Sequence, residues 1–113
     1  MEEDLEFLTD EINELWSGHL GETFPEGLTG KDINGIDLVS LDSDIAGCVV
    51  TFIDDGNLNL YQTAALGLCF QNVSFVMSIL NKEGRKYFGR LERLSELVLK
   101  AVAQKNLEEH LKN

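Results

Sequence analysis

The sequence predicts an all-α fold, a four-helix bundle-like single domain with a glycine-rich loop between the first and second helices. Apolar residues recur three and four positions apart in four segments of the chain, which is the spacing of amphipathic helices. The 113 residues include a single proline, Pro25, so the remaining segments lack the strongest helix breaker. At this length we expect one domain, residues 1–113, with its own hydrophobic core.

The N-terminal segment predicts an amphipathic helix. Its apolar residues follow the three- and four-residue spacing, and acidic residues fill the opposite side. Acidic residues near a helix start also suit the positive end of the helix dipole. Gly18 is the expected stop of this helix. The apolar stripe consists of Leu5, Leu8, Ile12, Leu15 and Trp16.

Residues 17–36 form the predicted loop, because they combine five glycines with the only proline. A connection of this length inside a small domain is usually either packed as an ordered segment or functional. We expect Phe24, Leu28 and Ile33 to anchor the loop to the core. The Asn34-Gly35 pair gives a weak signal for a short hairpin.

The second predicted helix covers residues 37–53, where an apolar stripe and a polar stripe both follow helical spacing. The β-branched run at residues 49–51 lowers the helix preference, so a strand is the alternative there. Turn-forming residues at 54–57 close the segment. The apolar stripe consists of Leu38, Leu41, Ile45, Cys48, Val49, Phe52 and Ile53.

The third predicted helix, near residues 59–81, is apolar over most of its circumference. The segment 57–81 carries no formal charge over 25 residues, which is long enough to span a bilayer. It also contains too many amides and hydroxyls for a membrane span. We therefore expect a central helix buried by its neighbours, and no association with membranes.

The fourth predicted helix begins after residues 81–84 and continues toward the C-terminus. Its first turns are basic, although the helix dipole disfavours cations there, so we expect acidic residues of the same chain to pair with them. The apolar face consists of Phe88, Leu91, Leu94, Val98, Ala101 and Val102. The basic residues are Lys82, Arg85, Lys86, Arg90 and Arg93.

The charges are segregated along the chain, and this is the main indication of function. Residues 1–56 carry fifteen acidic side chains against one base, Lys31, whereas residues 82–113 carry eight bases against five acids. The net charge of the whole chain is −11. Such a field repels nucleic acid and anionic membranes and attracts a basic protein surface. We therefore expect a basic protein partner and no nucleic-acid partner.

The acidic residues around the second helix are the main candidates for binding that partner. No basic residue occurs between Lys31 and Lys82 to offset them. Glu22 and Glu26 in the loop are secondary candidates. The alternative is that the acids are only the solvated faces of amphipathic helices. The main candidates are Asp37, Asp42, Asp44, Asp54 and Asp55, with Trp16 and Phe24 as apolar anchors.

The sequence contains no motif for catalysis or for cofactor binding, so we expect no cofactor, no metal site and no enzyme activity. The acidic runs lack the glutamate that an EF-hand needs at its twelfth position. His19 and His110 are expected at the surface. Cys48 and Cys69 fit neither a CxxC nor a metal-ligand spacing, so buried free thiols are expected, with a disulfide as the alternative. This use of cysteine favours the cytoplasm.

The leading hypothesis is a cytoplasmic module that masks or inhibits a basic protein partner. In size, helical pattern and acidity the chain is similar in character to immunity or antitoxin proteins that neutralise basic toxins such as nucleases, although no shared motif supports a family. One alternative is an oligomeric scaffold or accessory subunit that associates through the third helix. The other is an enzyme without a sequence signature, in which an aspartate or His19 acts as base.

Overall fold

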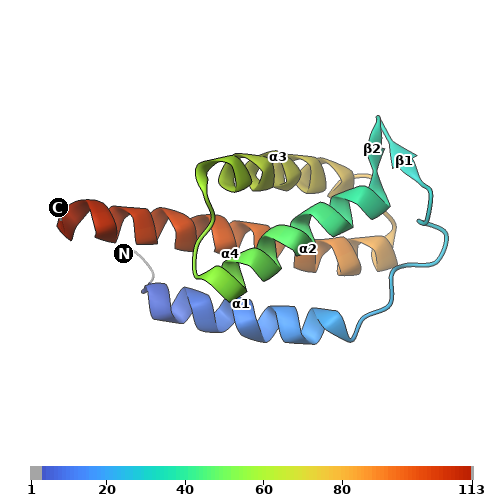
Figure 1. The fold of residues 1–113 in the computed structure, drawn as a ribbon. Helices are drawn as coiled ribbons and strands as arrows, with labels where there is room; N and C mark the ends of the chain where they lie inside the picture. The colour runs from blue at the N-terminus through green and yellow to red at the C-terminus, as the bar shows by residue number, and fades with distance from the viewer. Residues whose placement is uncertain (1–3, 113) are drawn as a thin grey trace.

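The computed structural model of the chain describes residues 4–112, which form four helices and one short hairpin (Figure 1). The hairpin strands β1 (Asp32–Ile33) and β2 (Ile36–Asp37) pair in antiparallel register. The predicted all-α, bundle-like class is confirmed. The helices are α1 (Leu5–Leu20), α2 (Leu38–Asp55), α3 (Leu60–Met77) and α4 (Lys82–Lys112).

Helix α4 is the centre of the fold, because each of the other three helices packs against it. Figure 1 shows α4 between α1 and α3, with α2 crossing in front of it. A helix with three neighbours must be apolar on more than one side, and α4 meets this requirement. Its fully buried side chains include Phe88, Leu91, Leu94, Leu97, Val98 and Ala101. They meet Leu8, Ile12, Ile45, Val49, Leu66, Val73 and Val76 from the surrounding helices.

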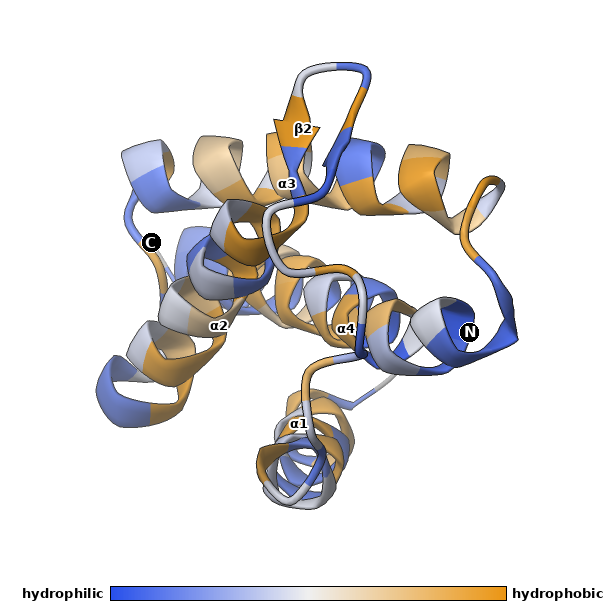
Figure 2. Cartoon of the chain, turned by 90° about the vertical axis from the view of Figure 1, so that its right-hand side faces the viewer, coloured by the Kyte–Doolittle hydropathy of each residue, from blue (hydrophilic) through white to orange (hydrophobic). Residues whose placement is uncertain are grey.

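Helix α3 is not the central, buried helix that the sequence predicts. Leu60 and Tyr61 are 88% and 84% exposed, and Leu68 is 63% exposed, whereas Leu66 and Val73 on the other side are buried. In Figure 2, α1 is seen end-on while α3 lies obliquely across the bundle, so its neighbours cover only one of its sides. No helix within residues 4–112 is long and apolar enough to cross a membrane.

Helix α2 begins and ends at residues suited to those positions. The Asp37 carboxylate accepts hydrogen bonds from the backbone N–H groups of Val39 (2.9 Å) and Ser40 (3.2 Å), which is the role of an N-cap. Gly56 ends the helix in the left-handed region, at φ 79°, where a side chain would be strained. The strand considered for residues 49–51 is wrong, because the whole segment is helical.

Helix α1 ends later than the sequence predicts, and the start of helix α3 is fixed by side-chain hydrogen bonds. Helix α1 continues through Gly18, the expected stop, to Leu20. Gly18 does not have the positive φ of a left-handed glycine cap, so it does not end the helix. Helix α3 begins with a capping box, in which the side chains of Asn59 and Gln62 each accept from the other's backbone N–H.

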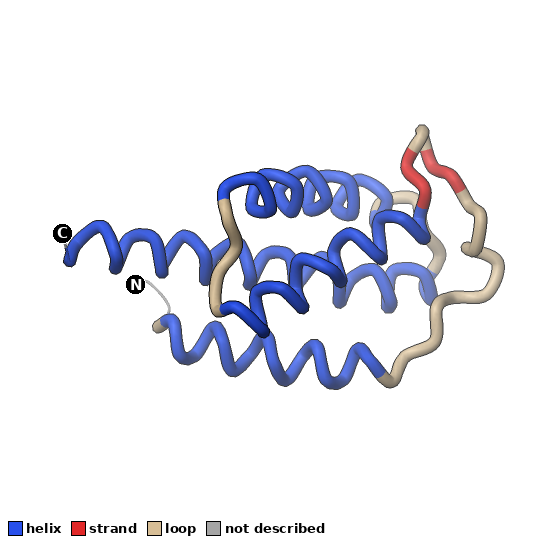
Figure 3. Tube along the Cα trace, viewed as in Figure 1, coloured by secondary structure: helices blue, strands red, loops and turns tan. Residues whose placement is uncertain are grey.

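The loop between α1 and α2 is ordered, and it ends in the hairpin shown in Figure 3. Asn34 (φ 52°) and Gly35 (φ 83°) both have positive φ, as a two-residue type I′ turn requires. The Asp32 carboxylate accepts from the Gly35 N–H at 2.6 Å and holds the turn. Phe24 anchors the start of the loop by packing against the core. The weak hairpin signal in the sequence is therefore confirmed.

The C-terminal part of α4 extends beyond the other helices (Figure 1). With 31 residues the helix is about 46 Å long, which explains the elongated dimensions of 49 × 26 × 26 Å. Lys105 makes the last long-range contact, donating from Nζ to the Gly56 carbonyl at 2.8 Å. Residues 106–112 are exposed.

Replacing Asp37 with alanine tests the cap of α2. We expect the free energy of unfolding to fall by about 1 kcal/mol, because the first N–H groups of the helix lose their acceptor. Asp37→Asn keeps an acceptor oxygen and should stay within a few tenths of a kcal/mol of wild type. Urea denaturation followed by circular dichroism measures both. Equal losses in the two variants would assign the effect to the charge and not to the cap.

Candidate functional site

The outer side of α3 is the most prominent apolar surface of the described residues. Five of the eleven large hydrophobic side chains that are exposed lie on α3 or directly after it. Tyr61, Leu68 and Phe75 are seven residues apart, so they follow one another along the same side of the helix. Apolar side chains gathered in this way mark interaction sites in soluble proteins. We name the group Leu60, Tyr61, Leu68, Phe75 and Ile79 the α3 outer face.

Carboxylates of α2 border this surface. A cavity of about 250 Å³ lies between the two helices, and Asp37 and Asp44 line it together with Cys69 and Asn72 of α3. Asp44 is exposed and makes no hydrogen bond or ion pair with any described residue. The α3 outer face itself carries no charge, since the whole segment 57–81 lacks one. An apolar centre with an acidic edge therefore covers the α2 and α3 side of the molecule.

The two thiols near this edge are free and half-buried. Burial, and then the charge of Asp44, raise the pKa of both thiols, that of Cys69 to about 11. The disulfide considered from the sequence is not formed. Because the reactive species is the thiolate, thiols held protonated in this way are poor nucleophiles and poor metal ligands.

The five predicted aspartates do not form one cluster. Asp37 caps α2, and Asp42 accepts a hydrogen bond from the Tyr87 hydroxyl at 3.0 Å on the side facing α4. Asp54 and Asp55 are exposed at the other end of α2, about 27 Å from its start. Of the five, the structure brings together only Asp37 and Asp44.

The negative charges of Asp54 and Asp55 at the C-terminus of α2 are compensated by a nearby cation of the same chain. Negative charge there opposes the helix dipole, which by itself would suggest that these acids serve a purpose other than helix stability. The Lys105 ammonium group bonds to the Gly56 carbonyl at the same helix end. A cation at this point offsets both the dipole and the two carboxylates, so their position alone is weak support for a binding role.

The predicted apolar anchors Trp16 and Phe24 are half-buried and pack against the core. The Phe24 ring lies edge-on to Tyr87 and Phe88, at centroid distances of 5.3 and 5.9 Å. Trp16 packs near His19, at 5.9 Å. Both side chains therefore pack within the chain. The exposed aromatic and aliphatic side chains of the α3 outer face are the ones available for contact.

His19 is buried, so the prediction of a surface histidine is wrong for this residue, whereas His110 is exposed as predicted. Arg90 donates from Nε to His19 Nδ1 at 3.0 Å, and the Tyr87 ring lies 4.7 Å from the imidazole. Burial, and then the charge of Arg90, lower the pKa of His19, while Asp42 and Glu22 oppose this shift. The neutral imidazole is the form that can accept from Arg90.

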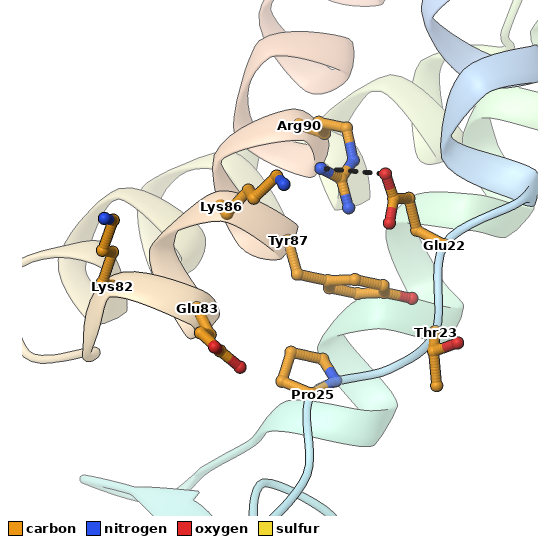
Figure 4. A pocket seen from close by; sticks show the side chains of 8 residues that line it. All are labelled: Glu22, Thr23, Pro25, Lys82, Glu83, Lys86, Tyr87 and Arg90. Carbon is orange, nitrogen blue, oxygen red and sulfur yellow. Dashed lines mark ion pairs between the residues drawn. The ribbon is translucent and has the colours of Figure 1, made fainter.

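Two of the basic residues of α4 pair with acids of the first half of the chain, as predicted. Arg93 bonds to Glu11 on α1 at 3.0 Å and also to Glu96 on its own helix. Arg90 lies 3.8 Å from Glu22 in the loop (Figure 4). Glu26, further along the loop, is exposed. These pairs connect α4 to α1 and to the loop, so Glu22 has a partner within the chain.

Within the described part of the chain, no group of three or more His, Cys, Asp or Glu side chains is arranged to hold a metal ion. No protein-family model matches the chain, and neither a curated protein nor a solved structure matches it. The interpretation of the site therefore depends on its own geometry and charge.

Because His19 is buried with a lowered pKa, the stability of the protein should depend on pH. Because the folded state lowers the pKa of this histidine below its usual 6.5, the unfolded chain binds the proton more readily. Stability is then fully present above about pH 6.5 and falls as the pH is lowered below that value. Urea unfolding between pH 7.5 and 5.5 should show a steeper loss for wild type than for His19→Asn, which keeps an acceptor but does not titrate. Parallel curves would contradict the assignment.

Proposed function

We propose that this protein is a non-catalytic binding module that covers a basic surface on a partner protein. The α3 outer face would form the apolar centre of the interface, and the acidic residues of α2 its edge. The observation that carries the proposal is the exposure of Tyr61, Leu68 and Phe75 on a helix without charges. The carboxylate of Asp44 lies beside this helix and has no ion-pair or hydrogen-bond partner among the described residues.

The magnitudes support a contact that includes both helices. Scaled by their exposure, Tyr61, Leu68 and Phe75 would contribute roughly 3–6 kcal/mol on burial. Association itself costs about 4–15 kcal/mol in lost translational and rotational freedom. Burial of these three side chains alone therefore does not suffice for a stable complex, and a partner that also contacts α2 gains the additional interactions.

The charge of the chain and of its exposed aspartates indicates which kind of protein would bind. Asp44, Asp54 and Asp55 are exposed, and none of them pairs with a described residue. A net charge of −11 would accelerate the approach of a basic protein and slow that of acidic ones. Carboxylates can occupy a cleft built for phosphates, which is how an immunity-type inhibitor would block a basic toxin or nuclease. The free thiols of Cys48 and Cys69 suit the reducing cytoplasm as the place of action.

Affinity capture from host lysate with matched variants tests this proposal. We expect wild type to retain one basic protein stoichiometrically and to release it as salt is raised. Leu68→Glu should abolish retention, because it places a charge in the apolar centre. Leu111→Glu, the same change at an exposed site at the far end of α4, should retain the partner. Equal retention by both variants, or no stoichiometric partner for wild type, would refute the interface.

The same partner then separates the role of charge from that of apolar contact. Reversing Asp44 and Asp54 to lysine should slow association severalfold or more at low ionic strength, and much less at high ionic strength. Glu109→Lys, a remote reversal on α4, is the control. An association rate that is unchanged in the aspartate variants would exclude these residues from the encounter.

The second candidate function is an oligomeric scaffold, and the charge-free segment 57–81 favours it. Two copies that each carry −11 repel one another least when they meet through this segment. Sedimentation velocity over a concentration series tests the candidate. A dimer that Leu68→Glu converts to a monomer is the expected result, and a wild type that stays monomeric at high concentration excludes it.

A further inference from the structure

A cavity of about 420 Å³ lies between the start of α4 and the loop that follows α1 (Figure 4). This volume falls within the range of small-molecule sites. Lys82, Lys86 and Arg90 line it, together with the acidic side chains of Glu22 and Glu83. The cavity is separate from the α2 and α3 surface used in the proposed function, and the inference drawn from it does not depend on that function.

The three basic residues are four positions apart, so they follow one side of α4. Each step is about 6 Å along the helix axis, and like charges at this spacing repel one another. In Figure 4 the Lys86 ammonium group points toward the Arg90 guanidinium, whereas the Glu83 carboxylate points the other way, toward Pro25. The Glu83 carboxylate therefore forms no ion pair with these bases, although it lines the same cavity and, like Glu22, should weaken the binding of an anion.

The pairing of these bases is uneven. Arg90 is held in place by its hydrogen bond to His19, and its guanidinium lies 5.6 Å from the centroid of the Tyr87 ring and 3.8 Å from the Glu22 carboxylate. Lys82 and Lys86, in contrast, make no ion pair or hydrogen bond with any residue in the range 4–112. The chain has 20 acidic residues and 9 basic ones, so unpaired lysines facing a cavity are unexpected.

We infer that this cavity binds a compact anion bearing a diphosphate group. The ammonium groups of Lys82 and Lys86 contact the phosphates, and Arg90, already held in position, supplies directed N–H donors at one end. Lysine binds phosphate as a point charge, and arginine does so through its planar fork of donors. Three bases over about 12 Å of helix fit a ligand with several charges better than a single phosphate.

The surrounding charges limit the size of the ligand. A long nucleic acid would extend into the field of residues 1–56, where fifteen acids face one base, and would be repelled. A compact anion feels mainly the lining of the cavity, because charges beyond about 8 Å are screened at physiological ionic strength. Glu22 competes with the ligand for Arg90, so it should weaken binding.

Calorimetric titration with inorganic pyrophosphate, at constant ionic strength, tests the inference. We expect saturable binding to one site. Lys86→Gln, and likewise Lys82→Gln, should weaken it about tenfold, the effect of losing one charge-assisted contact. Glu22→Gln should strengthen it, because the competing carboxylate is removed. Lys112→Gln, an exposed lysine at the other end of α4, should match wild type.

Any of three results would overturn the inference. The first is an absence of saturable binding, the second is equal affinities of Lys86→Gln and Lys112→Gln for pyrophosphate, and the third is equal binding of sulfate and pyrophosphate. Circular dichroism confirms that each variant is folded, which is expected because Lys82, Lys86 and Glu22 are exposed. A parallel titration with ADP distinguishes the source of the diphosphate. Tighter binding of ADP identifies a nucleotide, and equal binding identifies the diphosphate group alone as the recognised feature.

Discussion

Three helices pack against α4, and this arrangement requires α4 to be apolar on more than one side through the middle of its length. Successive buried residues there belong to different sides of the helix, so one element supplies the core contacts of all the others. The buried hydroxyl of Ser95 donates to the Leu91 carbonyl of the same helix and is therefore satisfied locally. With α4 in the centre, the other helices form a single layer around it. Each of them keeps one side open to solvent.

The polar contacts of α4 lie at its boundaries with neighbouring elements and determine how those elements are placed. The Tyr87 hydroxyl donates to Asp42 on α2, Arg90 bonds to His19 on α1, and Arg93 bonds to Glu11. Burial, and then the bond to Asp42, raise the pKa of Tyr87 to about 12, so it remains a donor at physiological pH. Of the eight carboxylates on α1 and α2, Glu11 and Asp42 therefore serve the fold. The other six are exposed: Glu6, Asp10, Glu14, Asp44, Asp54 and Asp55.

The helices could be predicted from the sequence because their apolar spacing is strong and long, and the hairpin because Asn34-Gly35 has a direct conformational meaning. The position of α3 within the bundle could not be predicted from the sequence. A helix that is apolar all round is compatible with a buried centre or with an uncovered apolar side, and only its neighbours decide between them. The absence of charge over residues 57–81 was the signal that pointed to the exposed side as well.

The roles of the candidate site residues were likewise only partly predictable from the sequence. Asp37 has a sequence that marks it as an N-cap, yet it was assigned to partner binding because charge counts do not separate the two roles. The burial of His19 had no local signal, since it follows from the distant contacts with Tyr87 and Arg90. The sequence suggests Trp16 and Phe24 as apolar anchors for a partner, whereas in the structure both side chains are half-buried against the core of their own chain.

The contact between Lys105 and Gly56 also marks where the tertiary support of α4 ends. Beyond it the side chains of residues 106–112 are exposed, and helical segments with little tertiary support are only marginally stable in water. Local opening should therefore begin at the C-terminus and stop at this bond, giving α4 a gradient of amide protection within one continuous helix. The last turns are accordingly the part of the molecule where sequence can be added or removed with the least effect on the core.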